Sequence, residues 1–315
     1  MKLLLLGANG QVGFELKRAV GGLADLVCAT RDGTLAGGGA CVRADVSQAV
    51  SLIDVLQDHA PDIVVNAAAY TGVDRAEEEP DLADRINHRA LAVLGAWAAS
   101  NDRLVVHYST DYVFDGTATR PYREDDATAP LGVYGQTKLA GEIALRESGC
   151  AHLVLRTAWV YAARGHNFLR TMLRVGSQRD ALNVVDDQRG SPTTARLIAR
   201  ASAEVLAAWS AAAAGERERL LGTYHLSAAG ECSWYEFAQA IFARAAAANL
   251  VTRVPTITPV PSAEYPTRAR RPACSVLDTT KIRRTFALDL PPWQAGLEQV
   301  IGELAAASTN PDTRQ

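Results

Sequence analysis

Short apolar runs alternate with longer amphipathic segments through the first half of the chain. The apolar runs are continuous, which is typical of strands buried on both faces of a parallel sheet. They lie at residues 2–6, 26–30, 62–66, 103–108 and 152–157. Segments with helical periodicity separate them, at residues 11–20, 50–59, 83–100 and 135–146. This alternation, with right-handed crossovers, predicts an α/β fold with a Rossmann-like doubly wound parallel sheet.

The pattern loosens beyond Val160. Helical periodicity then predicts helices over residues 167–175, 193–214 and 233–248. Ser233 and Glu236 have the spacing of a capping box, which favours a helix that begins there. Apolar residues predict strands at 183–187, running into a turn, and at 223–227. The prolines within residues 254–261 restrict that segment to an edge strand or an extended loop.

Two structural units follow from these patterns. We expect residues 1–160 to form an NAD(P)-binding Rossmann domain, to which residues 193–228 return. Residues 161–305 are expected to form mainly a smaller C-terminal substrate-binding lobe. The polar residues 306–315 are expected to form a disordered tail.

Composition and charge exclude several classes of protein. The 315 residues are 48% hydrophobic and 21% charged, as in a globular protein with a sizeable core. A net charge of −3 argues against nucleic-acid partners. No window approaches the ~20 apolar residues of a membrane helix, and the leucine run after Lys2 stops at Gly7, too early for a secretory signal. The 5 cysteines lack metal-binding spacing. These features together predict a soluble cytoplasmic protein with reduced thiols.

A glycine-rich turn follows directly after the first predicted strand. Small residues let the backbone turn sharply and approach a pyrophosphate, and the next helix points its N–H groups at the phosphates. A tight turn without a ligand would use the same residues, but the position after an amino-terminal strand favours dinucleotide binding. The expected cofactor-binding residues here are Gly7, Asn9, Gly10, Gln11, Val12 and Gly13.

Later strand ends supply further candidate cofactor contacts. An acidic residue on the adenosine ribose is expected about 20 residues after the turn. Arg31 stands there instead, which favours a 2′-phosphate and therefore NADPH, although NADH stays open and a solvated loop arginine is the alternative. Because ligands bind at the carboxyl edge of such sheets, we also expect contacts from Asp45, Val46, Ala67, Ala68 and Ala69.

Tyr134 and Lys138 are the candidate catalytic pair, and both are also expected to contact the cofactor. On one helix they stand a turn apart on the same face. A nearby ammonium favours the phenolate form of a tyrosine, and Lys138 also reaches the nicotinamide ribose of a bound cofactor. This spacing alone also fits a surface pair. The strand at 103–108, however, ends in hydroxyls, so Ser109 or Thr110 can bind a substrate carbonyl while Tyr134 supplies the proton.

Several longer strings carry a family resemblance. They are residues 66–77 (NAAAYTGVDRAE), 108–116 (YSTDYVFDG), 156–161 (RTAWVY) and 185–193 (VDDQRGSPT), with RP at 271–272 and SVLD at 275–278. Together with the glycine turn and the Tyr/Lys pair, they make the chain resemble the dTDP-4-dehydrorhamnose reductases of the extended short-chain dehydrogenase/reductase superfamily. The resemblance covers nearly the whole chain.

The resemblance implies an activity and a set of site residues. The activity is NAD(P)H-dependent reduction of the C4 keto group of dTDP-4-dehydro-β-L-rhamnose to dTDP-L-rhamnose. Thr110, Tyr134 and Lys138 are implied to be the catalytic triad, and Asp111, Tyr112 and Trp159 to lie beside the dTDP-sugar. An indole face suits the apolar face of a deoxysugar. Simple core packing is the alternative interpretation of Trp159.

The chain departs from the family pattern at two places. The family often holds Mg²⁺ at a homodimer interface through two glutamates. Glu15 matches the first, but Arg196 stands where the second is expected, so we expect no dedicated metal site and a Glu15–Arg196 ion pair in its place. A homodimer stays open. Cys274 stands where the family usually has asparagine, so its contact with the substrate lobe is open too.

Two other functions were weighed against this one. The first is a nucleotide-sugar epimerase or dehydratase of the same superfamily. Dehydratases usually have an acidic pair beside the catalytic hydroxyl, whereas Thr110 is followed by the single acid Asp111. The second is a non-catalytic NADP-binding regulatory subunit of methionine adenosyltransferase. The intact Thr110, Tyr134 and Lys138 favour catalysis. The residues leave open the nucleotide base and the C4 stereochemistry.

Overall fold

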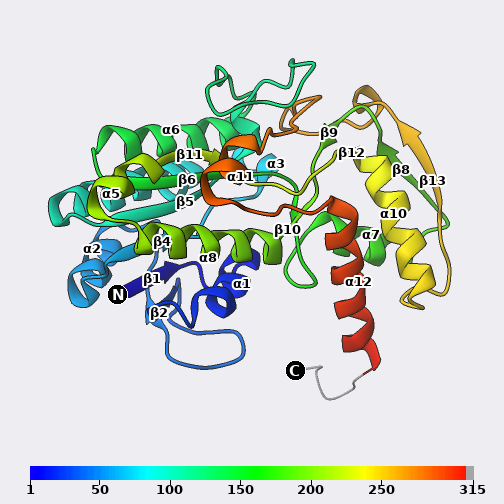
Figure 1. Cartoon of the computed structure of the whole chain (residues 1–315). Coiled ribbons are helices and arrows are strands. Elements are labelled where there is room, and N and C mark those ends of the chain that lie inside the picture. Colours follow the sequence, from blue (N-terminus) through cyan, green and yellow to red (C-terminus); the bar gives the residue numbers. More distant parts are fainter. Residues whose placement is uncertain (310–315) are drawn as a thin grey trace.

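A parallel seven-stranded sheet forms the centre of the molecule, in a computed structural model that describes residues 1–309 (Figure 1). Its strands are β1 (Lys2–Leu6), β2 (Asp25–Thr30), β3 (Val42–Arg43), β4 (Ile63–Asn66), β5 (Leu104–Thr110), β6 (Ala151–Thr157) and β11 (Gly222–His225). They lie in the order β3-β2-β1-β4-β5-β6-β11. The strand order reverses between β1 and β4, where folds of this kind bind ligands. The predicted Rossmann-like, doubly wound sheet is confirmed.

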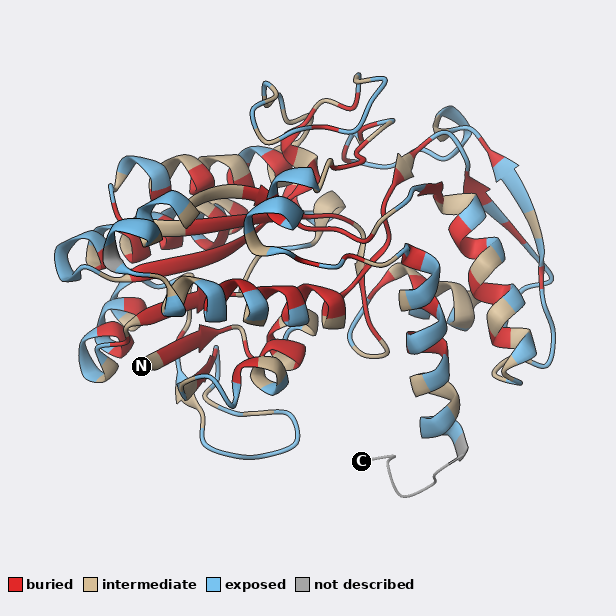
Figure 2. Ribbon diagram, viewed as in Figure 1, coloured by how far each residue is buried: buried red, intermediate tan, exposed pale blue. Residues whose placement is uncertain are grey.

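Helices cover both faces of this sheet. α1 (Gln11–Val20) and α8 (Ala195–Ala211) pack on one face, and α2 (Ala49–His59), α5 (Ala90–Asn101) and α6 (Val133–Glu147) on the other. In β1, Leu3 and Leu5 join the first core and Leu4 and Leu6 the second, because strand side chains alternate. In Figure 2 the strands of the large sheet are coloured mostly as buried. Each buried leucine contributes roughly 1.5–3 kcal/mol, which explains the continuous apolar runs.

The helix expected over residues 83–100 is interrupted. It begins as α4 (Pro80–Asp84), continues through the π-helical turn η1 (Arg85–Arg89) and ends as α5. Inside the π turn, the buried Asn87 donates hydrogen bonds to the Tyr70 carbonyl and to Thr137 Oγ1, and accepts one from the Tyr70 N–H. Helical periodicity does not indicate such hydrogen bonds between distant residues, so the π turn could not be predicted from it. A short helix, α3 (Val73–Ala76), precedes it.

The C-terminal lobe is built around a small parallel sheet at the right of Figure 1. β8 (Ala181–Val185) pairs with the edge strand β13 (Thr256–Val260). α7 (Phe168–Gly176) and α10 (Trp234–Ala247) pack on them. α10 has the predicted capping box, in which Ser233 and Glu236 bond each other's backbone N–H groups. Short strands complete the lobe: β7 (Val160–Tyr161), β9 (Arg189–Gly190), β10 (Thr193–Thr194) and β12 (Cys232–Ser233).

Residues 193–228, which we expected to return to the Rossmann domain, include α8 and β11. α8 begins at Ala195, later than predicted, because Thr193–Thr194 pair with β7 and the Thr194 hydroxyl caps the helix at the Leu197 N–H. α8 packs on α1, and β11 forms the edge of the large sheet beside β6. The remaining short helices are η2 (Asp111–Val113), α9 (Ala214–Arg217), η3 (Glu218–Leu220) and η4 (Ser262–Glu264).

Two C-terminal helices were not predicted, α11 (Thr280–Phe286) and α12 (Trp293–Thr309). α12 includes residues 306–309, which we expected in a disordered tail. They are helical because Leu304 packs against the main core and the Ser308 hydroxyl donates to the Leu304 carbonyl. Residues 310–315, the rest of that expected tail, lie outside the described residues. Within residues 1–309, no helix is both long and apolar enough to cross a lipid bilayer.

Candidate active site

The glycine turn between β1 and α1 has the conformation that close approach to a ligand requires. Gly7 has φ +78°, and a Cβ there would lie 2.7 Å from the Ala68 nitrogen. A Cβ on Gly13 would lie 2.1 Å from the Gly7 carbonyl oxygen. No side chain caps the amino end of α1, so its N–H groups and its dipole are directed at this turn. The turn therefore fits a pyrophosphate.

A cleft of ≈ 380 Å³ opens beside this turn at the carboxyl edge of the sheet. The predicted residues that line it are Gly7, Asn9, Gly10, Arg31, Val46, Ala67, Ala68 and Ala69. Its unpredicted lining residues are Thr30, Asp32, Ala44 and Ile86. Thr30 and Ala44 lie at or just after strand ends, a signal that the sequence did contain. The cleft therefore suits an extended, partly apolar dinucleotide.

Four predicted cofactor residues in this region do not line the cleft: Gln11, Val12, Gly13 and Asp45. The Gln11 side chain instead accepts a hydrogen bond of 2.7 Å from Asn167, in the C-terminal lobe. Asp45 accepts hydrogen bonds from the Ser47 backbone and hydroxyl. Burial acts to raise the pKa of Asp45, but these bonds and the nearby arginines hold it below its usual value.

Arg31 and Asp32 are the charged side chains that line the cleft, at its end beside β2, where the adenosine of a dinucleotide is expected. The Asp32 carboxylate accepts hydrogen bonds from the Thr30 hydroxyl and the Thr34 N–H, so it stabilises its own loop. The Asn9 amide holds the same loop through Thr34 and Ala36. Arg31 is exposed and makes no ion pair among the described residues. It is therefore the cation available to an anionic group in this part of the cleft.

Thr110 and Tyr134 meet where β5 ends and α6 begins. The Thr110 hydroxyl accepts from the Tyr112 N–H and donates to Asp111 Oδ1 at 3.0 Å. Burial raises the pKa of Tyr134 to about 12, and a hydrogen bond with Thr110 opposes that rise. Ser109 leaves the strand on the other face, and its buried hydroxyl has no partner among residues 1–309. Of the two candidate hydroxyls, Thr110 is the one beside the tyrosine.

Lys138 lies a turn beyond Tyr134 on α6, but its amine contacts other groups. Its Nζ lies 2.9 Å from His107 Nε2 and donates to the Tyr108 carbonyl at 2.6 Å. The expected lowering of the Tyr134 pKa by this lysine is absent, because the Lys138 Nζ is bonded elsewhere. His107 was not predicted as part of the site. It follows three apolar residues in β5, and a polar residue at such a buried position is a signal that the sequence did contain.

The expected substrate neighbours lie around the same strand end. Burial raises the pKa of Asp111 to about 6. The Tyr112 ring meets Tyr134 edge-on at 5.8 Å between centroids. Trp159, with φ +47°, stacks on Trp234 at 3.4 Å with an interplanar angle of 2°. One face of the Trp159 indole is thus covered by protein, and Trp234 is a neighbour that we did not predict.

A narrow crevice beside Tyr134 lies between the two lobes. Its walls come from Tyr112, Tyr134 and the segment 269–272 of the C-terminal lobe. Arg271 bonds both carboxylate oxygens of Asp74, at 3.2 and 2.7 Å. Burial acts to raise the pKa of Asp74, but these bonds hold it below its usual value. A ligand that reaches Tyr134 from this side therefore contacts both lobes.

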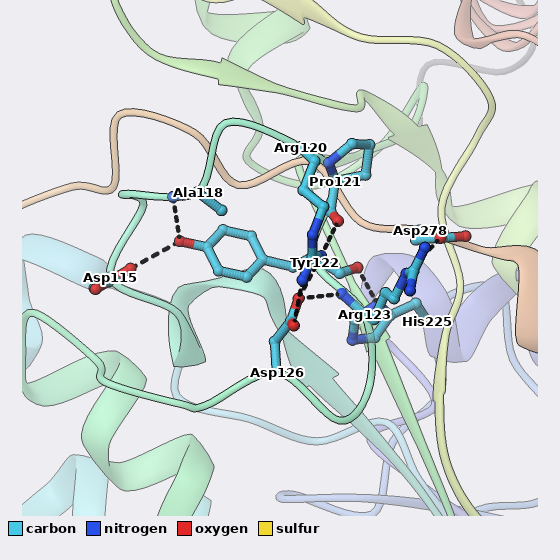
Figure 3. A network of polar contacts seen from close by, with 9 residues as sticks. All are labelled: Asp115, Ala118, Arg120, Pro121, Tyr122, Arg123, Asp126, His225 and Asp278. Atoms are coloured by element: carbon cyan, nitrogen blue, oxygen red, sulfur yellow. Dashed lines mark hydrogen bonds and ion pairs between the residues drawn. The ribbon is translucent and has the colours of Figure 1, made fainter.

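A polar network holds the loop that connects Thr110 to Tyr134 (Figure 3). The Tyr122 hydroxyl donates to Asp115 and accepts from the Ala118 N–H. Its carbonyl bonds His225 Nδ1 on β11, and its ring stacks on Phe114 at 4.2 Å. Burial lowers the pKa of His225 to about 3, so this histidine is neutral. The loop is thereby fixed to the large sheet.

The predicted ion pair between Glu15 and Arg196 is present. Arg196 Nε lies 3.3 Å from a Glu15 carboxylate oxygen, and its Nη1 lies 2.8 Å from one of Glu303. Among residues 1–309 no group of three or more acidic, histidine or cysteine side chains is placed to hold a metal. Cys274 is half-buried, and its backbone bridges to Arg189 on β9.

Comparisons with known proteins give a consistent family. A sequence model of the family described as RmlD substrate binding domain matches residues 1–306. The dTDP-4-dehydrorhamnose reductase of Escherichia coli K12 is 43% identical over 304 residues, which cover 96% of this chain and 98% of that one. The one from Burkholderia thailandensis is 45% identical over 307 residues, with coverage of 96% and 99%.

Solved structures agree with the sequence comparisons. The dTDP-4-dehydrorhamnose reductase of Bacillus anthracis, solved in complex with NADP, matches with a TM-score of 0.84 at 32% identity. The alignment covers 96% of this chain and 99% of that one. A UDP-glucose 4-epimerase of Thermus thermophilus, in complex with NAD, matches with a TM-score of 0.79 at 17% identity, covering 98% and 100%. At that identity the epimerase shows a shared fold only.

Proposed function

The chain belongs to the dTDP-4-dehydrorhamnose reductase family, and from this premise we propose which residues perform the reduction. The activity is reduction of the C4 keto group of dTDP-4-dehydro-β-L-rhamnose to dTDP-L-rhamnose. The observation that supports catalysis most directly is the meeting of Thr110 and Tyr134 at the carboxyl edge of the sheet. A hydroxyl and a phenol beside a dinucleotide-shaped cleft are the groups that carbonyl reduction needs.

Each protein group has a distinct role in this proposal. Tyr134 donates its phenolic proton to the keto oxygen, and burial keeps that proton in place at neutral pH. Thr110 binds the same keto oxygen and fixes the orientation of the sugar. Lys138 binds the nicotinamide ribose. The nicotinamide cofactor, when bound in the cleft, supplies the hydride.

We propose NADPH as the preferred cofactor. Arg31 is exposed at the adenosine end of the cleft and makes no ion pair among the described residues. The only nearby acid on the same loop, Asp32, is engaged by Thr30 and Thr34. A guanidinium pairs with a phosphate through charge-assisted hydrogen bonds, which a ribose hydroxyl forms less strongly. The NADP found in the Bacillus anthracis relative supports this choice.

The substrate site is proposed at the carboxyl edge of the sheet beside Tyr134. Asp111 and Tyr112 lie beside Tyr134, and Trp159 lies between the end of β6 and the start of β7. Ser109 stays a predicted substrate contact. A homodimer, a cytoplasmic location and the lack of nucleic-acid or membrane partners also stay predictions.

The direct test supplies freshly generated dTDP-4-dehydro-β-L-rhamnose and follows NADPH oxidation by absorbance. We expect oxidation in step with formation of dTDP-L-rhamnose, identified by NMR. dTDP-glucose, which has no keto group, serves as the control and should give no oxidation. Tight NADPH binding without turnover of the keto sugar would contradict the proposal and favour a non-catalytic, regulatory protein.

A further inference from the structure

A buried chain of hydrogen bonds leads from the cofactor cleft to Lys138. Asn66 and His107 are direct partners across the β4–β5 pair. Asn66 Nδ2 lies 3.3 Å from His107 Nδ1, and His107 Nε2 lies 2.9 Å from Lys138 Nζ. Lys138 Nζ then donates to the Tyr108 carbonyl at 2.6 Å. Asn66, His107 and Lys138 are each at most 1% exposed.

The direction of each bond follows from the first one. The Ala68 N–H donates to Asn66 Oδ1 at 3.1 Å, which fixes the amide and leaves its NH₂ group facing His107. An NH₂ group only donates, so His107 Nδ1 accepts. A neutral imidazole with Nδ1 as acceptor carries its proton on Nε2. Burial is the main cause that holds the pKa of His107 well below its ordinary value, against a hydrogen bond with the Asn66 backbone that acts to raise it, so the ring is neutral.

The proton on His107 Nε2 constrains Lys138. An ammonium has three donors and no acceptor, so it cannot receive a hydrogen bond from Nε2–H. An amine has a lone pair that accepts this bond, and its own N–H groups donate to the Tyr108 carbonyl. With the proton of His107 on Nε2, Lys138 therefore accepts that bond as the neutral amine.

The charged groups around Lys138 agree with this assignment. Glu142 follows it on α6, but both Glu142 carboxylate oxygens are bonded by the buried Arg156 of β6. Tyr134 on α6 and His107 on β5 are neutral, and Asp111 bonds Thr110. Burial lowers the pKa of Lys138 to about 7, and only Glu142 opposes it. No described carboxylate makes an ion pair with Lys138.

We propose that His107 is a positioning residue that holds Lys138 as a neutral amine in the cofactor-free protein. Binding of a nicotinamide dinucleotide then draws Lys138 off His107 and adds one proton from solvent to its Nζ. The ribose oxygens accept hydrogen bonds from the ammonium and the two phosphates favour its charge, whereas His107 Nε2–H repels it. The inference rests on the proposed contact between Lys138 and the ribose, and it couples cofactor affinity to pH.

The first test measures how many protons the unmodified protein takes up when NADP⁺ binds. Calorimetric titration with NADP⁺ at pH 8, in buffers of different ionisation enthalpy, should show uptake approaching one proton. The Kd for NADP⁺ should rise with pH above 7, by up to about tenfold per unit, because the bound form holds a proton that the free form lacks. NADP⁺ binding without proton uptake would overturn the inference and leave the proposed reductase function intact.

Two substitutions test whether Lys138 takes up the proton and whether His107 keeps it neutral beforehand. In His107→Gln the amide oxygen can accept from an ammonium, so Lys138 should keep its proton and the uptake and pH slope should fall toward zero. Lys138→Met, the matched control, should also abolish uptake. A His107→Gln protein with the uptake of the unmodified protein would contradict the role of His107.

A spectroscopic test stands even if the buried variants fail to fold. In protein labelled with ¹⁵N-histidine, His107 should show a protonated Nε2 and an unprotonated Nδ1 without cofactor. The opposite tautomer would overturn the proposal. Failure of NADP⁺ to bind at all would instead contradict the cofactor assignment on which the inference rests.

Discussion

The surroundings of Tyr134 strengthen its hold on the phenolic proton. A tyrosine in water loses its proton near pH 10. Here burial raises the pKa to about 12, and a hydrogen bond with Thr110 works in the other direction. Since the phenol stays protonated throughout the neutral range, it is ready to donate during reduction. The Thr110 hydroxyl also bonds Asp111, so the donor belongs to a small polar cluster in an apolar strand end.

Loss of the Tyr134 hydroxyl should lower the turnover rate and leave cofactor binding nearly unchanged. Tyr134→Phe is expected to lower kcat by about 10²–10⁴-fold, the range for losing a positioned acid. The NADPH dissociation constant should change little, because Tyr134 does not line the cofactor cleft. Stopped-flow reduction and fluorescence titration measure the two quantities. Tyr122→Phe, a hydroxyl loss in the connecting loop, is the matched control and should retain much more activity. A Tyr134→Phe enzyme with nearly normal turnover would remove Tyr134 from catalysis.

Also at the residue scale, Arg31 is the side chain that we expect to favour NADPH over NADH. Losing a charge-assisted contact with a 2′-phosphate costs roughly 1.5–3 kcal/mol. Arg31→Ala should therefore raise KM for NADPH by about tenfold or more and leave KM for NADH nearly unchanged. Steady-state kinetics with both cofactors measure this. Arg103→Ala removes an arginine that pairs with Asp62 far from the cleft, and should change neither KM. Equal losses with both cofactors would show that Arg31 is only a loop cation.

At the scale of elements, α6 carries the catalytic pair and must be held in register on the sheet. Gly135 and Gly141 let the helix approach closely, since a Cβ at either would meet backbone oxygen at 2.2 or 2.1 Å. Thr137 bonds Asn87 of the π turn. Glu142 bonds the guanidinium of Arg156 on β6, with both side chains at most 4% exposed. Tyr134 and Lys138 thus lie on a helix fixed on several sides.

Breaking the buried pair under α6 should destabilise the protein strongly. Glu142→Gln leaves the Arg156 charge buried without a counter-charge, which typically costs about 3–5 kcal/mol. Urea unfolding followed by circular dichroism should show a clearly lower midpoint. Glu147→Gln, on the exposed end of the same helix, is the matched control and should leave the midpoint within error. Similar midpoints for the two variants would mean that the pair contributes little to the position of α6.

At the scale of the whole molecule, the two lobes are joined by contacts around α1. Arg196 of α8 bonds both Glu15 of α1 and Glu303 of α12. The Gln11–Asn167 hydrogen bond connects the start of α1 with the C-terminal lobe. The same short helix therefore contacts the cofactor turn at its amino end and the C-terminal lobe along its side.

The Arg196 bridge leads to a prediction about metal dependence. Mg²⁺ requires near-octahedral oxygen ligands, and an arginine between Glu15 and Glu303 both occupies these carboxylates and repels the ion. Dialysis against EDTA should leave activity and melting temperature unchanged, and added Mg²⁺ should raise neither. Arg196→Glu, which restores a second carboxylate, is the informative variant, and its melting temperature should rise with Mg²⁺. An EDTA-sensitive melting temperature in the unmodified protein would mean that the metal ligands lie elsewhere.

The sequence by itself determined the sheet, most helices and the candidate residues of the site. The hydrophobic period and the length of an apolar run are local properties of the sequence, so β1, α1 and the capping box before α10 could be predicted. The strings shared with the family implied Thr110, Tyr134 and Lys138. Only the tertiary structure decided which groups touch. The π turn at Asn87, the stacking of Trp234 on Trp159 and the bond from Lys138 to His107 join residues distant in sequence. Such contacts depend on how elements pack in three dimensions, which periodicity does not encode.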